Sequence, residues 1–410
     1  MQHSIHVSSE IGALRAVLLH RPGSELESLT PRYLDSMLFE DIPFLAQMQE
    51  EHDQFARVLT DHGCFVYYVS DLLKEVLEYP QQQRQAIDYL IGSSHIISPD
   101  LGHIIREHLE GYSPGELASC CIAGLRKTEV DPKIKKKTLS YYIRDAYPYY
   151  ISPLPNLYFT RDPATVVKDG ISINLMKTEA RRRERWIMSM ITKTHPLFAS
   201  VPIHADYSAN SSIEGGDILM LSESCAIVGS SARTEVWAIE AFARTMMAPK
   251  ESKGEGLDQV LVIQIPYTRA YMHLDTVFTM VDRDAFCMYG GIEASVKVFS
   301  ITKGRRDTLN IHEEPNLRSA LKKALSVPSV RIIRASGDDA IAADREQWND
   351  SNNTLAIDCG TVITYRRNII SNETLEKNGV TVIPIQGSEL VRGRGGPRCM
   401  SMPLCRDQIQ

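Results

Sequence analysis

The sequence predicts an α/β fold in which one supersecondary unit recurs along the chain. The first observation behind this fold class is a repeated order of two short strands around a turn, then a helix, then another strand. The second is a segment rich in helix signals and poor in strand signals. Together they predict a repeating α/β body over residues 1–71 and 150–410, with a helical insertion over residues 72–149. Repeated units of this kind stack or close into a ring.

The last two units carry the clearest pattern. In the last one, strands are predicted at 354–358 and 361–365, a helix at 371–379 and a strand at 380–385. The unit before it has predicted strands at 276–280 and 286–289, a helix at 316–325 and a strand at 330–335. Glycine at position 379 is typical of a helix end, because glycine accepts the positive φ of that position.

Three further units repeat the order with unequal lengths. Their predicted elements are strands at 217–221 and 226–230, a helix at 234–247 and a strand at 259–266; strands at 157–160 and 171–176 with a helix at 178–191; and a strand at 14–20, a helix that follows Thr30-Pro31 and ends at Gly63, and a strand at 64–69. Threonine before proline is typical of a helix start. In the insertion, Ser98-Pro99 predicts one helix start, and Ser113 with Glu116 predicts a capping box.

Composition excludes several function classes. The net charge of −6 argues against a nucleic-acid binder, whose binding surface would be basic. No stretch approaches the roughly 20 apolar residues of a membrane span, and the first residues lack an apolar signal core. The eight cysteines form no Cys-x-x-Cys pair, which favours free thiols in a reducing compartment. We therefore expect a cytoplasmic protein without nucleic-acid or membrane partners.

Polar stretches occupy equivalent places before or within the first strand of several units. They cover residues 156–162, 212–217 and 272–276. Closure of the units into a ring would bring Asp162, Glu214, His273 and Asp275 together, near the loop that carries Cys399. Each piece also has an ordinary structural explanation: His273 and Asp275 as a satisfied polar pair, the glycines beside Glu214 as a tight turn, and Cys399 as a buried thiol.

Five motifs resemble the arginine deiminase family of bacteria, within the guanidine-modifying superfamily. They are LPNLYFTRDP, SIEGGD, MHLDTVFTM, REQWND and ELVRGRGGPRCMSMP, and the resemblance covers nearly the whole chain. It implies a five-bladed, pseudo-five-fold α/β propeller of ββαβ units with an inserted helical domain. It also implies hydrolysis of free L-arginine to L-citrulline and ammonia, the first step of arginine fermentation, without metal or organic cofactor, by a homo-oligomer (dimer or tetramer).

The resemblance also implies the role of each catalytic residue. Asp162 and Asp275 would bind the guanidinium, since carboxylates accept its paired N–H groups. Cys399 would attack the guanidinium carbon, giving a covalent thiouronium-type intermediate, and His273 would serve as general acid and base. Glu214 would orient His273 and favour its charged form. Bound substrate would assist ionisation of the Cys399 thiol, because a neighbouring cation lowers a cysteine pKa.

The amino-acid end of the substrate has its own implied partners. Arg181, Arg233 and Arg394 would bind the α-carboxylate, because arginine donates bidentate hydrogen bonds to carboxylates. Asn156 and Phe159 would contact the amino-acid end and the aliphatic chain. The loop at 392–399 would then act as a lid that contains the nucleophile. Arg398 and the REQWND stretch receive no chemical role.

Other functions remain open from the sequence. A relative with the same residues could transfer the amidine to an amine, or hydrolyse agmatine or methylated arginine. A non-enzymatic protein could use the arginine–glycine run to bind an acidic partner. A zinc hydrolase could use His273, Asp275 and Cys399, although their spacing matches no common zinc site.

Overall fold

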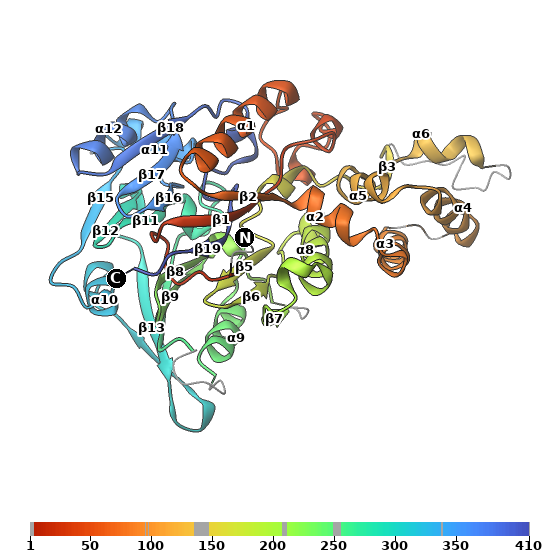
Figure 1. Cartoon of the computed structure of the whole chain (residues 1–410). Helices are drawn as coiled ribbons and strands as arrows, with labels where there is room; N and C mark the ends of the chain where they lie inside the picture. The colour runs from red at the N-terminus through yellow and green to blue at the C-terminus, as the bar shows by residue number, and fades with distance from the viewer. Residues whose placement is uncertain are drawn as a thin grey trace.

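Five sheets of the computed structural model share one strand pattern (Figure 1). The model describes residues 4–94, 96, 98–134, 147–206, 211–248, 256–337 and 339–409. Each sheet contains an antiparallel pair of strands followed by a strand parallel to the middle one. The five sets are β19 (Met402–Arg406), β1 (Leu14–Leu19) and β2 (Phe65–Tyr68); β5 (Ala164–Val167), β6 (Gly170–Ile173) and β7 (Ile203–Asp206); β8 (Ile218–Ser222), β9 (Cys225–Ser230) and β10 (Gln259–Gln264); β11 (Phe278–Asp282), β12 (Ala285–Met288) and β15 (Arg331–Arg334); and β16 (Leu355–Asp358), β17 (Thr361–Tyr365) and β18 (Thr381–Ile385). The mixed α/β fold is therefore confirmed.

The two ends of the chain meet in the first sheet. β19 pairs antiparallel with β1, with Leu18 opposite Met402, and β2 pairs parallel with the other side of β1. β1 is buried at every position except Arg15. The last strand therefore supplies the outer partner that the first unit lacks in its own sequence.

A helix follows the antiparallel pair in each unit. These helices are α1 (Leu45–Asp61), α8 (Arg182–Thr194), α9 (Val236–Met246), α10 (Leu317–Leu325) and α12 (Ile369–Lys377), with α11 (Ala340–Trp348) as an additional helix before β16. Buried residues of α8 include Ile187 and Ile191. The helices and strands predicted for the last three units are confirmed to within a few residues.

Two predicted elements are wrong. The helix expected after Thr30-Pro31 begins only at Leu45, because Pro43 disfavours helical backbone at the residue before it and lacks an N–H donor. The first half of the strand expected at 157–160 lies within a 3₁₀ turn, Pro155–Tyr158, and β5 begins later at Ala164. Proline fixes φ at the start of that turn, which suits a helical turn better than a strand.

An extra hairpin joins two neighbouring units. Strands β13 (Lys297–Lys303) and β14 (Leu309–Glu313) lie between β12 and α10 in the sequence, but β13 pairs antiparallel with β10 of the preceding unit. The third sheet therefore has five strands. This hairpin was not predicted from the sequence, because β14 is largely exposed and neither strand has a clear alternating pattern.

The segment between β2 and β4 is mainly helical and extends to one side of the sheets (Figure 1). Its elements are α2 (Val69–Val76), α3 (Pro80–Ser93), α4 (Pro99–Glu110), α5 (Pro114–Ala123), β3 (Leu125–Arg126), α6 (Lys127–Val130) and β4 (Tyr149–Ile151). The predicted capping box of α5 is confirmed, since Ser113 Oγ accepts the Glu116 N–H at 3.3 Å and Glu116 Oε2 accepts the Ser113 N–H at 2.8 Å. Residues 95, 97 and 135–146 of the predicted insertion lie outside the described residues.

In the described part of the chain, every helix is too short or too polar to cross a membrane.

A buried histidine makes the packing of α1 sensitive to acid. His52 lies beside Phe55 and Tyr68, and neither of its ring nitrogens has a hydrogen-bond partner among the described residues. Burial, with a smaller contribution from the charge of His20, lowers the pKa of His52 to about 3. The unfolded chain has a histidine pKa of about 6.5. The stability from neutral His52 is therefore complete above pH ~6.5 and is lost as the pH falls toward about 3.

We therefore expect His52→Leu to make folding less sensitive to acid. Between about pH 7.5 and about pH 5, the wild type should lose roughly 2 kcal/mol of unfolding free energy through this residue, and the variant should not. Urea unfolding of both proteins at the two pH values measures the difference. The exposed His103, replaced by Leu, serves as the control. A wild type and His52→Leu variant with parallel pH dependence would contradict the assignment.

Candidate active site

The candidate residues stand immediately before the first strand of their sheets. Asp162 precedes β5, Glu214 precedes β8, Asp275 precedes β11 and Cys399 precedes β19. The fifth sheet has Asn353 in the same place, two residues before β16 begins. The structure therefore brings together the residues that the sequence analysis expected to meet, and it adds Asn353.

Hydrogen bonds connect these five segments in a closed circuit. Each link runs from a donor in one segment to an acceptor in the next. The links are Arg161 N–H to Cys399 O at 3.1 Å, Gly215 N–H to Asp162 O at 3.0 Å, Leu274 N–H to Asp217 Oδ1 at 2.8 Å, Asn353 Nδ2 to Asp275 O at 3.1 Å, and Cys399 N–H to Asn353 Oδ1 at 2.9 Å. The circuit fixes the backbone of every segment that carries a candidate side chain.

His273 and Glu214 form a buried, charged pair. His273 Nε2 lies 2.7 Å from Glu214 Oε2, and His273 Nδ1 lies 3.9 Å from Asp162 Oδ1. Burial alone would lower the pKa of His273, but Asp162 and Glu214 outweigh it and raise that pKa to about 9. Burial would likewise raise the pKa of Glu214, but Arg233 and His273 hold it well below its usual range. The raised pKa favours the charged imidazolium at neutral pH.

Close packing around His273 depends on a glycine. A Cβ atom at Gly216 would lie 2.7 Å from the His273 ring and 3.0 Å from Asp162 Oδ1. The Gly216 N–H instead donates to Asp162 Oδ1 at 3.1 Å. Any larger residue would separate the imidazole from that carboxylate, which explains the second glycine of the SIEGGD stretch.

The Cys399 thiol is buried among acidic side chains. Its Sγ lies 3.5 Å from Asp275 Oδ2 and 3.1 Å from Asn353 Nδ2. Burial, then the charges of Asp275, Asp162 and Asp350, raise the pKa of Cys399 well above its ordinary value, and Arg398 opposes them. The raised pKa favours the protonated thiol, which donates its hydrogen to Asp275.

Two buried arginines already pair with the carboxylates expected to bind a guanidinium. Arg181 Nη1 donates to Asp162 Oδ2 at 2.7 Å, and Arg398 Nη1 donates to Asp275 Oδ2 at 2.8 Å. Arg181 also pairs with Glu184, with Nη2 to Oε2 at 2.8 Å. Arg181 therefore lies at the carboxylate assigned to the substrate guanidinium. Arg398, which received no role, is the buried counter-ion of Asp275.

Arg233 and Arg394, the other two residues predicted to bind the substrate α-carboxylate, have N–H groups without hydrogen-bond partners among the described residues. Arg233 Nη1 has no hydrogen-bond partner among the described residues and lies 3.8 Å from Glu214 Oε1. The Arg394 guanidinium stacks 3.5 Å above the Trp348 ring and donates from Nη2 to Ala270 O at 3.3 Å. Its Nε and Nη1 are buried without partners among the described residues. Both side chains can therefore accept a further anionic partner.

Of the two remaining residues predicted to bind the substrate, Phe159 packs against the loop at 392–399, whereas Asn156 bonds to Met37. Asn156 donates from Nδ2 to Met37 O at 2.7 Å, so its amide is already occupied on that side. Phe159 is buried, and a Cβ atom at Gly395 would lie 2.3 Å from its ring. The glycine thus allows the loop to pass directly over the aromatic ring.

Several functional-site residues were missed by the sequence analysis. Glu184 anchors Arg181, Asn353 holds Cys399, and Asp350 is a buried carboxylate without a hydrogen-bond partner among the described residues. Burial, opposed by Arg394, raises the pKa of Asp350 to about 7. The position of Asn353 before a first strand, equivalent to Asp162 and Asp275, could have identified it from the sequence.

One group of side chains could hold a metal ion. The ligand atoms of Asp162, Glu214 and His273 lie within 4.8 Å of one another. Arg181 Nη1 lies 2.7 Å from Asp162 and 3.9 Å from Glu214, so a guanidinium already faces both carboxylates. The set His273, Asp275 and Cys399, considered for zinc from the sequence, does not form such a group in the described residues.

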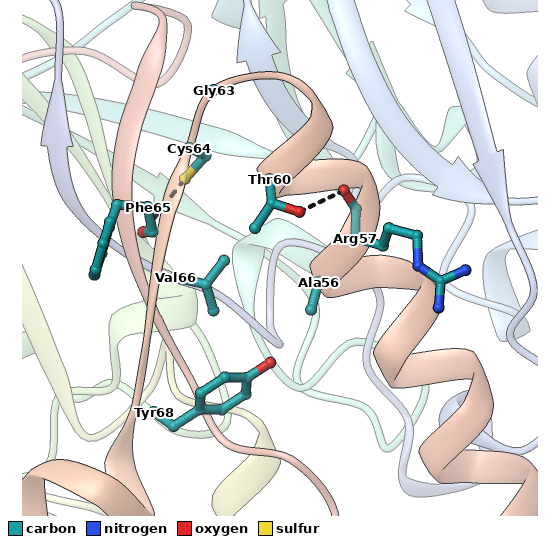
Figure 2. Close-up of a pocket in the computed structure, with 8 residues that line it drawn as sticks. All are labelled: Ala56, Arg57, Thr60, Gly63, Cys64, Phe65, Val66 and Tyr68. Carbon is teal, nitrogen blue, oxygen red and sulfur yellow. Dashed lines mark hydrogen bonds between the residues drawn. The ribbon is translucent and has the colours of Figure 1, made fainter.

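A shallow groove between α1 and β2 shares no lining residue with this site (Figure 2). Its lining residues are Ala56, Arg57, Thr60, Gly63, Cys64, Phe65, Val66 and Tyr68. None of them belongs to the candidate set. The Cys64 pKa is raised to about 12 by burial, so this thiol is a poor nucleophile.

Comparisons with known proteins match the whole chain. A family model described as arginine deiminase matches residues 35–406. The chain is 43% identical over 416 residues to the arginine deiminase of Latilactobacillus sakei subsp. sakei (strain 23K), and 45% identical over 415 residues to that of Bacillus cereus (strain B4264), with 100% of each chain covered in both cases. A solved amidinotransferase of Microseira wollei, from the saxitoxin biosynthetic pathway, has a TM-score of 0.58 at 13% identity, covering 99% of this chain and 98% of its own. That last similarity concerns the fold alone.

The raised His273 pKa should depend on Glu214. In Glu214→Gln the histidine loses one of the carboxylates that outweigh its burial, so its pKa should fall from about 9 by at least one unit. Proton–nitrogen NMR titration of His273 in both proteins measures the shift. The control is Glu235→Gln, since Glu235 is bonded to Lys177 and does not contact the imidazole. An unchanged His273 pKa in Glu214→Gln would show that the pair is not the cause.

Proposed function

The chain belongs to the arginine deiminase family, and from that premise we propose that it hydrolyses free L-arginine to L-citrulline and ammonia through a covalent intermediate on Cys399. As a member of that family it is a hydrolase of C–N bonds in linear amidines, with a cysteine nucleophile. The observation that carries the proposal is the convergence of one thiol, one imidazolium and the carboxylates of Asp162 and Asp275 within one hydrogen-bonded circuit.

Asp162 and Asp275 are suited to bind the substrate guanidinium. Each already accepts a hydrogen bond from a protein guanidinium, at 2.7 Å from Arg181 and 2.8 Å from Arg398. A guanidinium presents paired N–H groups in one plane, which match two carboxylates placed at its edges. We propose that the substrate takes Asp162 Oδ2 from Arg181 Nη1, while Glu184 keeps the rest of the Arg181 side chain in place.

Binding of this cation prepares the nucleophile. The carboxylates of Asp275, Asp162 and Asp350 raise the Cys399 pKa in the unliganded protein. A substrate guanidinium between Asp162 and Asp275 offsets two of those charges and adds a positive one, so the thiolate becomes favourable. The thiol proton passes by way of Asp275, whose Oδ2 lies 3.5 Å from Sγ, to solvent, so that Asp275 is a carboxylate again when it holds the guanidinium. The substrate thereby assists the ionisation of its own nucleophile.

The first half-reaction releases ammonia. The Cys399 thiolate forms a bond to the guanidinium carbon and gives a tetrahedral adduct. His273, protonated at neutral pH because its pKa is about 9, donates a proton to the departing terminal nitrogen. The C–N bond breaks, ammonia leaves, and the amidine carbon stays on Cys399 as an S-alkylthiouronium. His273 is now neutral.

The second half-reaction consumes water. Neutral His273 takes a proton from a water molecule, and the resulting hydroxide bonds to the same carbon. The C–S bond of the adduct then breaks with its electron pair on sulfur, and the hydroxyl proton of the adduct passes to that sulfur. The products are the Cys399 thiol and the ureido group of citrulline. Glu214, 2.7 Å from His273 Nε2, stabilises the imidazolium that forms in this step.

The amino-acid end of the substrate would meet arginines with spare donors. Arg233 and Arg394 have nitrogens without hydrogen-bond partners among the described residues, so an α-carboxylate can bind them without displacing another acceptor. We assign Arg181 to the same carboxylate once its Nη1 has left Asp162. Phe159, which packs against the loop at 392–399, and Asn156 would contact the aliphatic chain and the head group.

We also propose that the five sheets are the blades of a pseudo-five-fold propeller, with residues 72–149 as an inserted helical domain. The repeated strand order and the pairing of β19 with β1 support the ring, and the run of helices from α2 to α6 supports the insertion. A cytoplasmic location and a dimeric or tetrameric state remain predictions.

Cys399 should be the only cysteine required for turnover. We expect Cys399→Ala to lower citrulline formation by at least about 10³-fold, because no other group can form the covalent adduct. Cys405→Ala, a partly buried thiol six residues later, should retain activity. Acid-quenched wild-type enzyme with L-arginine should carry the amidine adduct on the peptide containing Cys399, detected by mass spectrometry. Citrulline production by Cys399→Ala, or an adduct on another cysteine, would refute the mechanism.

Arg394 should favour substrates that carry an α-carboxylate. In Arg394→Ala we expect the KM for L-arginine to rise about 10- to 100-fold, since a charged hydrogen bond is lost. The kcat/KM for agmatine, which lacks the carboxylate, should change little. Steady-state assays of ammonia release with both substrates measure the difference. Equal losses for L-arginine and agmatine would show that Arg394 acts on the loop rather than on the carboxylate.

A further inference from the structure

Asn353 contacts the nucleophile through both ends of its amide. Its Oδ1 accepts the Cys399 backbone N–H at 2.9 Å, and its Nδ2 lies 3.1 Å from Cys399 Sγ. Nδ2 also donates to Asp275 O at 3.1 Å. The side chain is fully buried. A single amide thus connects the backbone of Cys399, its sulfur and the segment that carries Asp275.

The contacts fix which end of the amide faces the sulfur. The Cys399 N–H requires an acceptor, and the Asp275 carbonyl requires a donor. Only one orientation of the Asn353 amide satisfies both. Nδ2 has two hydrogens, so one can bind Asp275 O while the other points at Sγ. The sulfur therefore receives an N–H donor whatever its own protonation state.

This donor is alone in an otherwise acidic environment. Among the described residues, Asn353 is the sole hydrogen-bond donor to Cys399 Sγ, and the other contact of the sulfur is with Asp275. Burial and three carboxylates oppose the thiolate, and Arg398 offsets them only in part. An N–H donor stabilises the charged form of an acceptor, and the effect is stronger in a dry site. The Asn353 amide therefore stabilises the Cys399 thiolate, whereas the surrounding carboxylates destabilise it.

The loop of the nucleophile also packs directly on Asn353. A Cβ atom at Gly396 would lie 2.8 Å from Asn353 Cβ and 2.9 Å from Asn353 Oδ1. The Arg398 N–H approaches Asn353 O at 3.4 Å. The loop can approach this closely only because position 396 is glycine. Asn353 is therefore held between the Asp275 segment and the loop that ends in Cys399.

We propose that Asn353 is the positioning residue of the nucleophile, holding the Cys399 backbone and stabilising its thiolate by a hydrogen bond to Sγ. The proposal rests on Cys399 being the nucleophile of the proposed function. It adds to that function a residue that lies outside the REQWND stretch and was not among the site residues predicted from the sequence. In the ring of five segments, Asn353 occupies the place held elsewhere by acids and the thiol, and it supplies a neutral donor there.

The test measures the Cys399 thiol without substrate. The rate of alkylation by iodoacetamide, followed from pH 6 to about 11 with the modified cysteine identified by mass spectrometry, reports the thiolate fraction. In Asn353→Ala we expect the thiolate fraction at a given pH to fall about 10-fold, an upward pKa shift of about one unit. The value of kcat for L-arginine should fall at least about 10-fold, with a smaller change in KM.

Asn353→Asp separates the hydrogen bond to sulfur from the role in folding. Aspartate keeps the shape and the acceptor for the Cys399 N–H, but it replaces the N–H donor with a carboxylate. We expect a thermal midpoint closer to the wild type than that of Asn353→Ala, and slower Cys399 alkylation than in Asn353→Ala. Asn352→Ala is the matched control, since Asn352 is buried next to Asn353 but contacts Cys287 and Ser351 instead.

Three results would overturn the proposal. The first is a Cys399 alkylation profile in Asn353→Asp identical to that of the wild type. The second is a shift in Asn353→Ala no larger than that in Asn352→Ala. The third is a lowered thermal midpoint in Asn353→Ala with an unchanged thiol pKa, which would indicate a purely structural residue. Because alkylation needs no arginine, these outcomes are independent of whether the wild type turns over L-arginine.

Discussion

The closed circuit of hydrogen bonds among five loop segments is the constraint on which the rest of the site depends. Each link uses a backbone group or a buried side chain that has no access to water, so breaking one link leaves an unpaired polar group. The segments come from positions as distant as 161 and 399, and no local interaction could align them. The alignment of Cys399, His273 and the two aspartates therefore follows from the way the sheets are arranged, rather than from any single loop.

Charge balance is the second constraint, and it follows from the first. The circuit places Asp162, Asp275 and Glu214 close together in a dry interior, where unpaired carboxylates would be costly. Buried guanidinium and imidazolium groups offset them: Arg181 on Asp162, Arg398 on Asp275, and His273 on Glu214. Protein cations thus stabilise the buried carboxylates. A site built in this way favours a cationic ligand that can replace or join those cations.

Periodicity allowed the fold class and most elements to be predicted, because each strand pair and helix carries its own local pattern. Local signals failed where distant residues decide the outcome. The helix expected after Thr30-Pro31 begins only after Pro43. A turn that begins at Pro155 replaces the first half of the strand expected at 157–160. The predicted catalytic residues meet in the structure, but Asn353 and Arg398 act through contacts more than 40 positions away in the sequence. The pairing of Arg181 with Asp162 could not be predicted from the sequence either, since it depends on where the two side chains lie in the folded structure.

The same charge balance connects substrate recognition to activation on the proposed mechanism. In the unliganded protein the Cys399 thiol is neutral, because burial and carboxylates disfavour its ionisation. A guanidinium between Asp162 and Asp275 reverses that balance, whereas a neutral urea cannot, since it carries no charge to offset the carboxylates. Conversion of the guanidinium to the ureido group of citrulline therefore removes the stabilisation of the thiolate at the moment the product forms. Reprotonation of Cys399 and return of Arg181 to Asp162 would then both favour product release. The carboxylates that bind the substrate thus also limit the reactive thiolate to the period when a cation occupies the site.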